Sequence, residues 1–141
     1  MAINSGKVVA GGLLAGLVLN IGDFLINGVL MAADYAAAMS RLGLDPAAME
    51  TPSVALSWIA VDFLFGLLIV WTYAAIRPRF GPGPKTAVLA AFPLFAAATL
   101  ILYGFTAMGL FTFGVFFKGT IYSAVNVLIG GIVGAWAYKE A

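Results

Sequence analysis

The sequence contains neither cysteine nor histidine. The missing cysteine excludes disulfide bonds and thiolate metal sites, and the missing histidine removes the commonest metal and haem ligand and the usual general base. Charged residues are also scarce, at 9% of the 141 residues, whereas soluble domains carry about 25%. A net charge of +1 gives no basis for binding nucleic acid. We therefore predict no metal, no cofactor, no catalytic set and no nucleic-acid partner.

Apolar residues are abundant instead, at 63% of the sequence, with a mean hydropathy of +1.07. A chain this short cannot hide so much apolar surface in one core that faces water. Four segments reach the length of about 20 apolar residues that crosses a bilayer. They cover residues 8–33, 54–76, 87–108 and 115–138. The sequence thus predicts one all-α transmembrane domain over residues 1–141, a polytopic antiparallel four-helix bundle with the lipid bilayer as its solvent.

The distribution of lysine and arginine predicts the orientation, because these residues accumulate in cytoplasmic loops. Only Arg41 lies clearly on one side of the predicted spans. On the other side lie Lys7, Arg77, Arg79, Lys85 and Lys139. This asymmetry places both termini and a loop over residues 77–86 in the cytoplasm, and a longer loop over residues 34–53 outside.

The loops contain local signals for helix ends. Asp45-Pro46 and Thr51-Pro52 each combine an N-cap residue with a first-turn proline. They predict a short helix after Asp45 and the start of the second span. Residues 36–42 are predicted to form another short helix at the membrane interface. The three prolines of residues 77–86 predict that no helix continues through that loop, and Pro93 predicts a bend in the third span.

Small and polar residues form stripes on three of the spans, because helical residues turn by about 100° each. Such stripes let backbones approach closely and let polar groups pair away from lipid. We therefore predict that they face inward, with packing sites at Gly12, Gly16, Gly66, Gly119, Gly130 and Gly134.

The polar members of these stripes are predicted to form one buried cluster. A charge at bilayer depth costs roughly 2.5–3.5 kcal/mol on insertion scales, so the two intramembrane aspartates need partners. At about 1.5 Å per residue, both share a layer with Asn126. Lys118 lies only about 5 Å down, from where it can reach either the carboxylates or the headgroups. The predicted cluster is Asn20, Asp23, Asn27, Asp62, Asn126 and Lys118.

The second and fourth spans also share a weak repeat. Val61-Asp62 and Gly66 align with Val125-Asn126 and Gly130, and Trp-x-Tyr follows in both spans after one inserted residue. Parallel repeats occur in membrane transporters, but chance matches are frequent in apolar sequence. Duplication and coincidence both stay open.

Three functions are compatible with the cluster. In the first, it only fixes helix packing, and the chain is a non-enzymatic accessory or scaffolding subunit of a homo-oligomer or larger membrane complex. In the second, Asp23 and Asp62 carry protons or cations through a permeation protein. The third is an intramembrane aspartyl-type hydrolase, because Asn20-Ile-Gly-Asp23 faintly resembles a Gly-x-Gly-Asp motif, with Asn20 in place of the first glycine. We predict the first, with permeation as the main alternative.

Three features extend over the whole chain: a glycine-rich first span leading to Arg41-Leu-Gly43-Leu, a minimal second outer connection, and a last span with Tyr122, Gly130, Gly134 and Ala135-Trp136. In these features the chain resembles a family of small, uncharacterised bacterial four-span membrane proteins, grouped as a domain of unknown function. The resemblance implies the four-span fold and no particular activity. We accordingly expect the chain in the bacterial inner (plasma) membrane.

Overall fold

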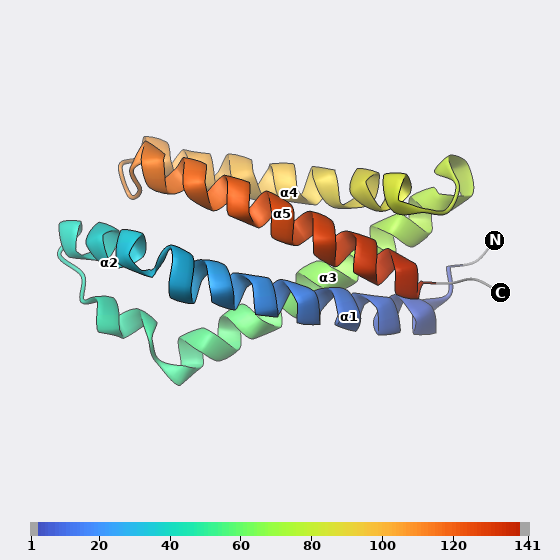
Figure 1. Cartoon of the computed structure of the whole chain (residues 1–141), viewed down its shortest axis with the longest axis horizontal. Helices are drawn as coiled ribbons and strands as arrows, with labels where there is room; N and C mark the ends of the chain where they lie inside the picture. The colour runs from blue at the N-terminus through green and yellow to red at the C-terminus, as the bar shows by residue number, and fades with distance from the viewer. Residues whose placement is uncertain (1–2, 139–141) are drawn as a thin grey trace.

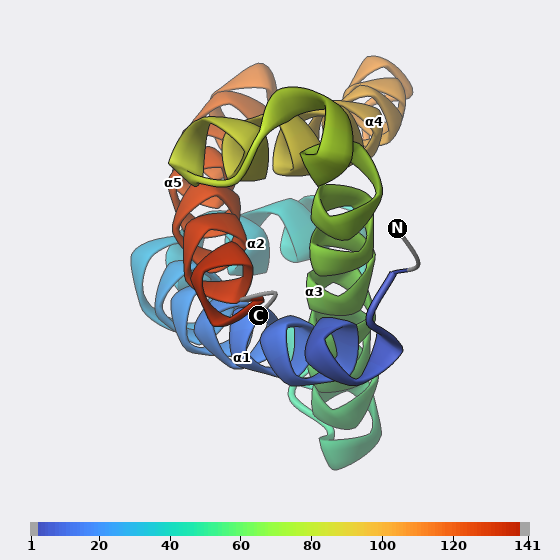
Figure 2. The ribbon, with the colours of Figure 1, turned by 90° about the vertical axis from the view of Figure 1, so that its right-hand side faces the viewer.

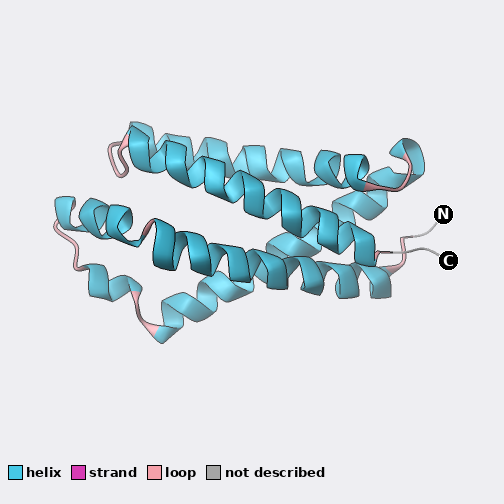
Figure 3. Ribbon diagram, viewed as in Figure 1, coloured by secondary structure: helices cyan, strands magenta, loops and turns pink. Residues whose placement is uncertain are grey.

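The computed structural model describes residues 3–138, and within them all regular structure is helical (Figures 1 and 3). Four helical segments are long and apolar enough to cross a membrane, which confirms the predicted fold class. The elements are α1 (Ser5–Leu25), the π-helical turn η1 (Ile26–Leu30), α2 (Ala32–Arg41), the 3-10 turn η2 (Pro46–Met49), α3 (Pro52–Phe80), α4 (Pro84–Ala107) and α5 (Phe113–Ala137).

The four long helices form a ring in which α1 and α4 lie opposite each other (Figure 2). Each of these two packs against both α3 and α5. The start of α1 meets the end of α5, where the Asn4 N–H donates to the Tyr138 hydroxyl at 3.2 Å. We call this end of the bundle the basic end, because Lys7, Arg77, Arg79 and Lys85 lie at its helix termini. The opposite end, with α2, η2 and the α4–α5 turn, is the loop end.

Small side chains allow the helices to pack closely toward the basic end. A Cβ atom on Gly66 of α3 would lie 2.5 Å from the Gly12 carbonyl oxygen and 2.5 Å from the Gly16 nitrogen of α1. Likewise, a Cβ atom on Gly11 would lie 2.7 Å from the Gly134 carbonyl oxygen of α5. Helix α1 therefore touches both neighbours backbone to backbone, and the glycine stripes lie at these contacts. Fully buried residues fill the remaining space: Ala15, Ile69, Val70, Ala87, Ala90 and Ala91.

Toward the loop end the ring opens between α3 and α4. Figure 1 shows the first turns of α3 leading away from α4, while α4 stays beside α5, where the Tyr103 and Phe116 rings meet at 5.7 Å. Leu100 of α4 and Met108, which follows its last residue, are 71% and 74% exposed. Such apolar surface is suited to contact with lipid tails or with other membrane helices, where no water has to be displaced.

The first predicted span, residues 8–33, ends earlier in the structure, where the helical segment long enough to cross a membrane is Ser5–Leu30. Within it, α1 ends at Leu25 and passes into the π-helical turn η1. The chain bends at Met31, whose N–H closes η1 with a hydrogen bond of 2.8 Å to the Ile26 carbonyl. Asn27-Gly28 lies in this turn, and both residue types are weak helix formers. After the bend, α2 starts at Ala32, four residues before the predicted interfacial helix.

The prediction that prolines end the helix at residues 77–86 was wrong for Pro78. Helix α3 continues to Phe80, and the connection to α4 is only residues 81–83. Pro78 lies in the last turn, so it costs α3 a single backbone bond, and the Gly81 N–H closes that turn on the Arg77 carbonyl at 2.8 Å. Pro84 occupies the first turn of α4, where its missing N–H has no consequence. Helix α4 is also continuous across Pro93.

Both predicted proline-marked helix starts are confirmed. The Asp45 carboxylate accepts a hydrogen bond from the Ala47 N–H at 3.0 Å and caps η2. Thr51 precedes α3, which begins at Pro52. The fixed φ of a first-turn proline acts locally at both starts, whatever the surrounding fold, whereas a capping side-chain hydrogen bond is made only by Asp45 and not by Thr51.

Candidate functional site: an intramembrane carboxyl cluster

Polar side chains from three helices meet within the membrane-spanning part of the bundle. Asp23 comes from α1, Asp62 from α3 and Asn126 from α5. The Asn126 amide donates to Asp23 Oδ1 at 2.8 Å and to the Leu19 carbonyl at 3.0 Å. Asn126 and Asp62 are only 6% and 7% exposed. A single side-chain amide thus ties α5 to α1 by two hydrogen bonds, and we call Asp23, Asp62 and Asn126 the carboxyl cluster.

The carboxyl groups of Asp23 on α1 and Asp62 on α3 are neighbours. Ionised carboxylates are acceptors only and repel each other, so this placement favours a proton on one of the two groups, which can then donate to the other. The cluster as a whole connects three helices at one level.

The space for the Asn126 amide comes from a glycine that the sequence reasoning missed. A Cβ atom on Gly22 would fall directly on the Asn126 side chain. Gly22 therefore lets the amide approach the α1 backbone closely enough to reach both of its acceptors. Its signal in the sequence is its place directly before Asp23.

The other predicted cluster members lie elsewhere. Asn20 donates to the Gly16 carbonyl at 2.9 Å within α1 and to the Ile59 carbonyl of α3 at 3.4 Å. Asn27 is exposed in η1. Lys118 is 55% exposed, and its Nζ lies 3.0 Å from Asp34 Oδ2. The bend at Met31, between η1 and α2, explains this last difference, since it places Asp34 of α2 next to the start of α5, within reach of the Lys118 ammonium group.

Lys118→Met provides a test of this placement. An exposed ion pair contributes little, so we expect the variant to change the free energy of unfolding by less than about 1 kcal/mol. Unfolding of the detergent-solubilised chain in increasing dodecyl sulfate measures this. Asp34→Asn is the matched control and should have an effect of the same small size. A much larger loss for Lys118→Met alone would show that the lysine is paired with the intramembrane carboxyl groups.

Tyr35 covers the cluster from the loop end and was also missed. Its hydroxyl would lie 3.6 Å from a Cβ atom on Gly119, and its ring meets Phe111 edge to face at 6.3 Å. Burial, and then the nearby charges of Asp23 and Asp34, raises the pKa of the Tyr35 hydroxyl above its usual value. The Tyr35 hydroxyl therefore stays uncharged. The signal in the sequence is that Met31, Tyr35 and Ala38 recur at helical spacing. This pattern begins before the predicted interfacial helix.

Toward the basic end the cluster lies on an apolar layer. Its buried residues are Leu19, Ile69, Ala91 and Val127. Their exposed fractions are between 0% and 9%, and Phe65, Leu94 and Phe95 pack against them. Within one chain, this layer separates the carboxyl groups from the basic end. Among residues 3–138, no group of three or more acidic side chains gathers in a way that could hold a metal ion.

The two halves of the weak repeat occupy related places. Asp62 and Asn126 both lie in the carboxyl cluster, on the two helices that flank α1. At the ends of the same two helices, Tyr73 and Tyr138 meet edge to face at 6.0 Å. The aligned positions thus serve the same two contacts, whether they arose by duplication or by coincidence.

Comparison of the chain with protein-family models, with curated proteins and with solved structures gives no match. The resemblance to the small four-span family stays a prediction, and function has to be inferred from the geometry of the cluster.

Proposed function

We propose that this chain is a non-enzymatic accessory or scaffolding subunit of the bacterial inner membrane, with both termini in the cytoplasm. One observation carries the proposal: the Asn126 amide and the two aspartate carboxyl groups satisfy one another across α1, α3 and α5. A polar group buried in lipid is costly unless it is paired. These pairs make the cluster a cross-link that fixes helix register, and the apolar layer beneath it gives ions no polar route.

The surfaces left over support a role in a larger assembly. Helix α4 is held mainly through its half near the basic end, where Ala87, Ala90 and Ala91 are fully buried. Its other half and the first turns of α3 are exposed, as described above. These exposed apolar faces of α4 and α3 can add a surface to a homo-oligomer or to a larger membrane complex.

The mass of the native particle tests the subunit role. We expect the chain, extracted with its surrounding lipid by a maleic acid copolymer, to form a particle with more protein than one 14.7 kDa chain. A photo-crosslinking residue at Leu100 of α4 should capture a reproducible neighbour, which mass spectrometry would identify. The same residue at Ile21 of α1, which is 57% exposed, serves as a matched control. A single chain with no crosslinked product at Leu100 would refute the role.

Proton or cation permeation is the second candidate, and the direct Asp23–Asp62 contact favours it, since a shared proton can be exchanged. If the scaffold proposal is right, liposomes containing the chain should show no proton flux above protein-free liposomes in a pH gradient. Asp23→Asn and Asp62→Asn should remain folded and be as stable or more stable, because an amide costs less to bury than a charge. Proton flux in the natural chain that disappears in a folded Asp62→Asn variant would contradict the scaffold proposal and support permeation.

A further inference from the structure

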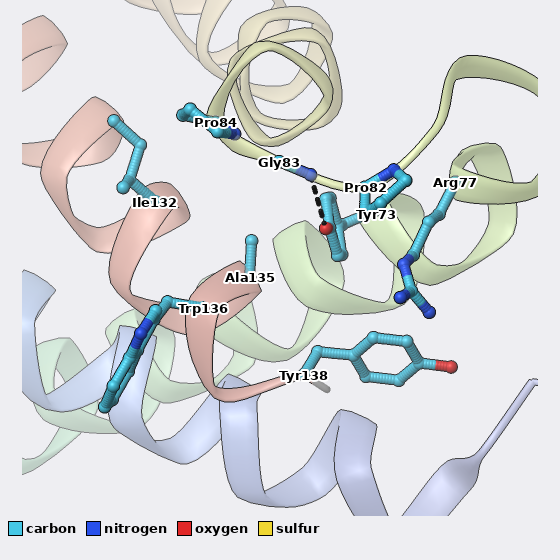
Figure 4. Close-up of a pocket in the computed structure, with 9 residues that line it drawn as sticks. All are labelled: Tyr73, Arg77, Pro82, Gly83, Pro84, Ile132, Ala135, Trp136 and Tyr138. Atoms are coloured by element: carbon cyan, nitrogen blue, oxygen red, sulfur yellow. Dashed lines mark hydrogen bonds between the residues drawn. The ribbon is translucent and has the colours of Figure 1, made fainter. Parts of the chain in front are cut away.

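A second feature, far from the carboxyl cluster, lies at the basic end. A cavity of about 400 Å³ opens between the end of α3, the turn to α4 and the end of α5 (Figure 4). This volume is in the range of small-molecule sites, which run from about 300 to 1,000 Å³. Its wall includes Tyr73, Arg77, Gly83, Ile132, Trp136 and Tyr138. The cavity takes part in neither the cluster nor the proposed subunit contacts.

The polar side of this cavity is fixed by its neighbours. The Arg77 guanidinium lies over the Tyr138 ring, 5.9 Å from its centre. The Tyr138 hydroxyl accepts the Asn4 N–H described above, and the Tyr73 hydroxyl accepts the Gly83 N–H at 3.1 Å. A guanidinium held against a fixed aromatic wall is suited to binding a phosphate group, with which it can form two parallel hydrogen bonds.

The other side of the cavity is apolar and continues toward the membrane interior. Ile132 and Trp136 lie one turn apart on α5 and are 39% and 66% exposed. From Tyr138 to Ile132 the helix runs about 9 Å deeper into the membrane. Tryptophan and tyrosine are typical of the headgroup level. The cavity therefore changes from cationic to apolar along the membrane normal, in the same order as a phospholipid does.

Further cations lie near the cavity, since Arg79 and Lys85 are exposed at the same end. Basic pockets between membrane helices attract anionic headgroups. We propose that this cavity binds the phosphate of an anionic membrane phospholipid at Arg77, with one acyl chain along Ile132 and Trp136.

Quenching of Trp136 by brominated lipid tests the proposal on the full chain. Trp58→Phe and Trp71→Phe leave Trp136 as the reporter, since the sequence has three tryptophans. In phosphatidylcholine vesicles, we expect brominated phosphatidylglycerol to quench with an apparent affinity about fivefold above that of brominated phosphatidylcholine. Arg77→Gln should abolish this preference. Arg79→Gln removes the same charge outside the cavity and should leave most of the preference in place. Equal quenching by both lipids, or equal losses in both variants, would overturn the site.

A second variant keeps the test decisive if Arg77→Gln does not fold. Ile132→Tyr narrows the apolar side, leaves the arginine intact and does not interfere with tryptophan excitation. It should reduce the preference, whereas Leu128→Tyr, one turn deeper on the same face and outside the cavity, should not. Undiminished preference in Ile132→Tyr would contradict binding of a lipid chain here.

Inorganic phosphate distinguishes a lipid from a soluble ligand with the same chemistry. At constant ionic strength, millimolar inorganic phosphate should leave the quenching by brominated phosphatidylglycerol unchanged, because a free anion gains nothing from Ile132 and Trp136. Recovery of Trp136 fluorescence on adding phosphate would assign the cavity to a free phosphate group and overturn the lipid proposal.

Discussion

Gly66→Ala is expected to destabilise the folded chain by roughly 3 kcal/mol, near the upper end of the usual cost of overpacking. The added methyl group would meet the backbone of Gly12 and Gly16 at 2.5 Å, and backbone cannot move aside as a flexible side chain can. To make room, α1 and α3 would have to separate, which also parts Asp23 from Asp62. Unfolding in mixed dodecyl sulfate and dodecyl maltoside micelles, followed by circular dichroism, measures the loss.

Gly104→Ala is the matched control for this substitution. Gly104 also lies within a membrane-spanning helix, but a Cβ atom there would have no neighbour within 4 Å. We expect the control to be neutral or slightly stabilising, by at most about 1 kcal/mol, because alanine favours helix more than glycine does. If Gly66→Ala behaved like Gly104→Ala, the close approach of α1 and α3 would not exist in the membrane.

Asn126→Leu is expected to cost about 2 kcal/mol. Leucine has nearly the same volume but donates no hydrogen bond, so Asp23 Oδ1 loses the Asn126 donor and the Leu19 carbonyl keeps only its bond within α1. A buried acceptor that loses its donor carries its full desolvation cost. The same unfolding experiment measures the effect, and crosslinking of cysteines placed at Ala91 and Gly131 reports whether α5 stays on α4. This readout is clean because the chain has no cysteine of its own.

Asn27→Leu is the control for the loss of an asparagine. Asn27 is exposed in η1, outside the carboxyl cluster. The substitution should therefore change the free energy of unfolding by no more than a few tenths of a kcal/mol, as surface substitutions usually do. Equal losses at both positions would mean that the Asn126 hydrogen bonds contribute nothing particular to the fold.

The long helices could be predicted because lipid imposes a simple rule. Every backbone group in the membrane must be bonded internally, so apolar length alone indicates a helix. The inward stripes followed from helical periodicity, which is why Asp62, Asn126 and Gly66 could be assigned to helix contacts before their partners were known. The ends of helices depend on weaker local effects. The prediction that the helix would end before Pro78 was wrong because a proline in the last turn removes only one backbone hydrogen bond.

Side-chain partners were harder to predict than helix faces. Lys118 lies near the start of its helix, as predicted, yet its long side chain could reach in two directions, and only the position of Asp34 decides between them. That position depends on η1 and the bend at Met31 that follows it, which apolar composition does not signal. The contributions of Tyr35 and Gly22 depend on the same tertiary arrangement, so neither could be assigned from the sequence alone.

A double-mutant cycle between Asp23 and Asn126 tests most directly whether the cluster ties the helices together. The free energies of unfolding of the natural chain, Asp23→Leu, Asn126→Leu and the double variant give the coupling between the two side chains. The account predicts a coupling of about 1 kcal/mol, within the range measured for hydrogen bonds between membrane helices, with the double variant losing less than the two single losses added together. Strictly additive losses would mean that the two side chains do not interact in the membrane, and would contradict the role assigned to the cluster.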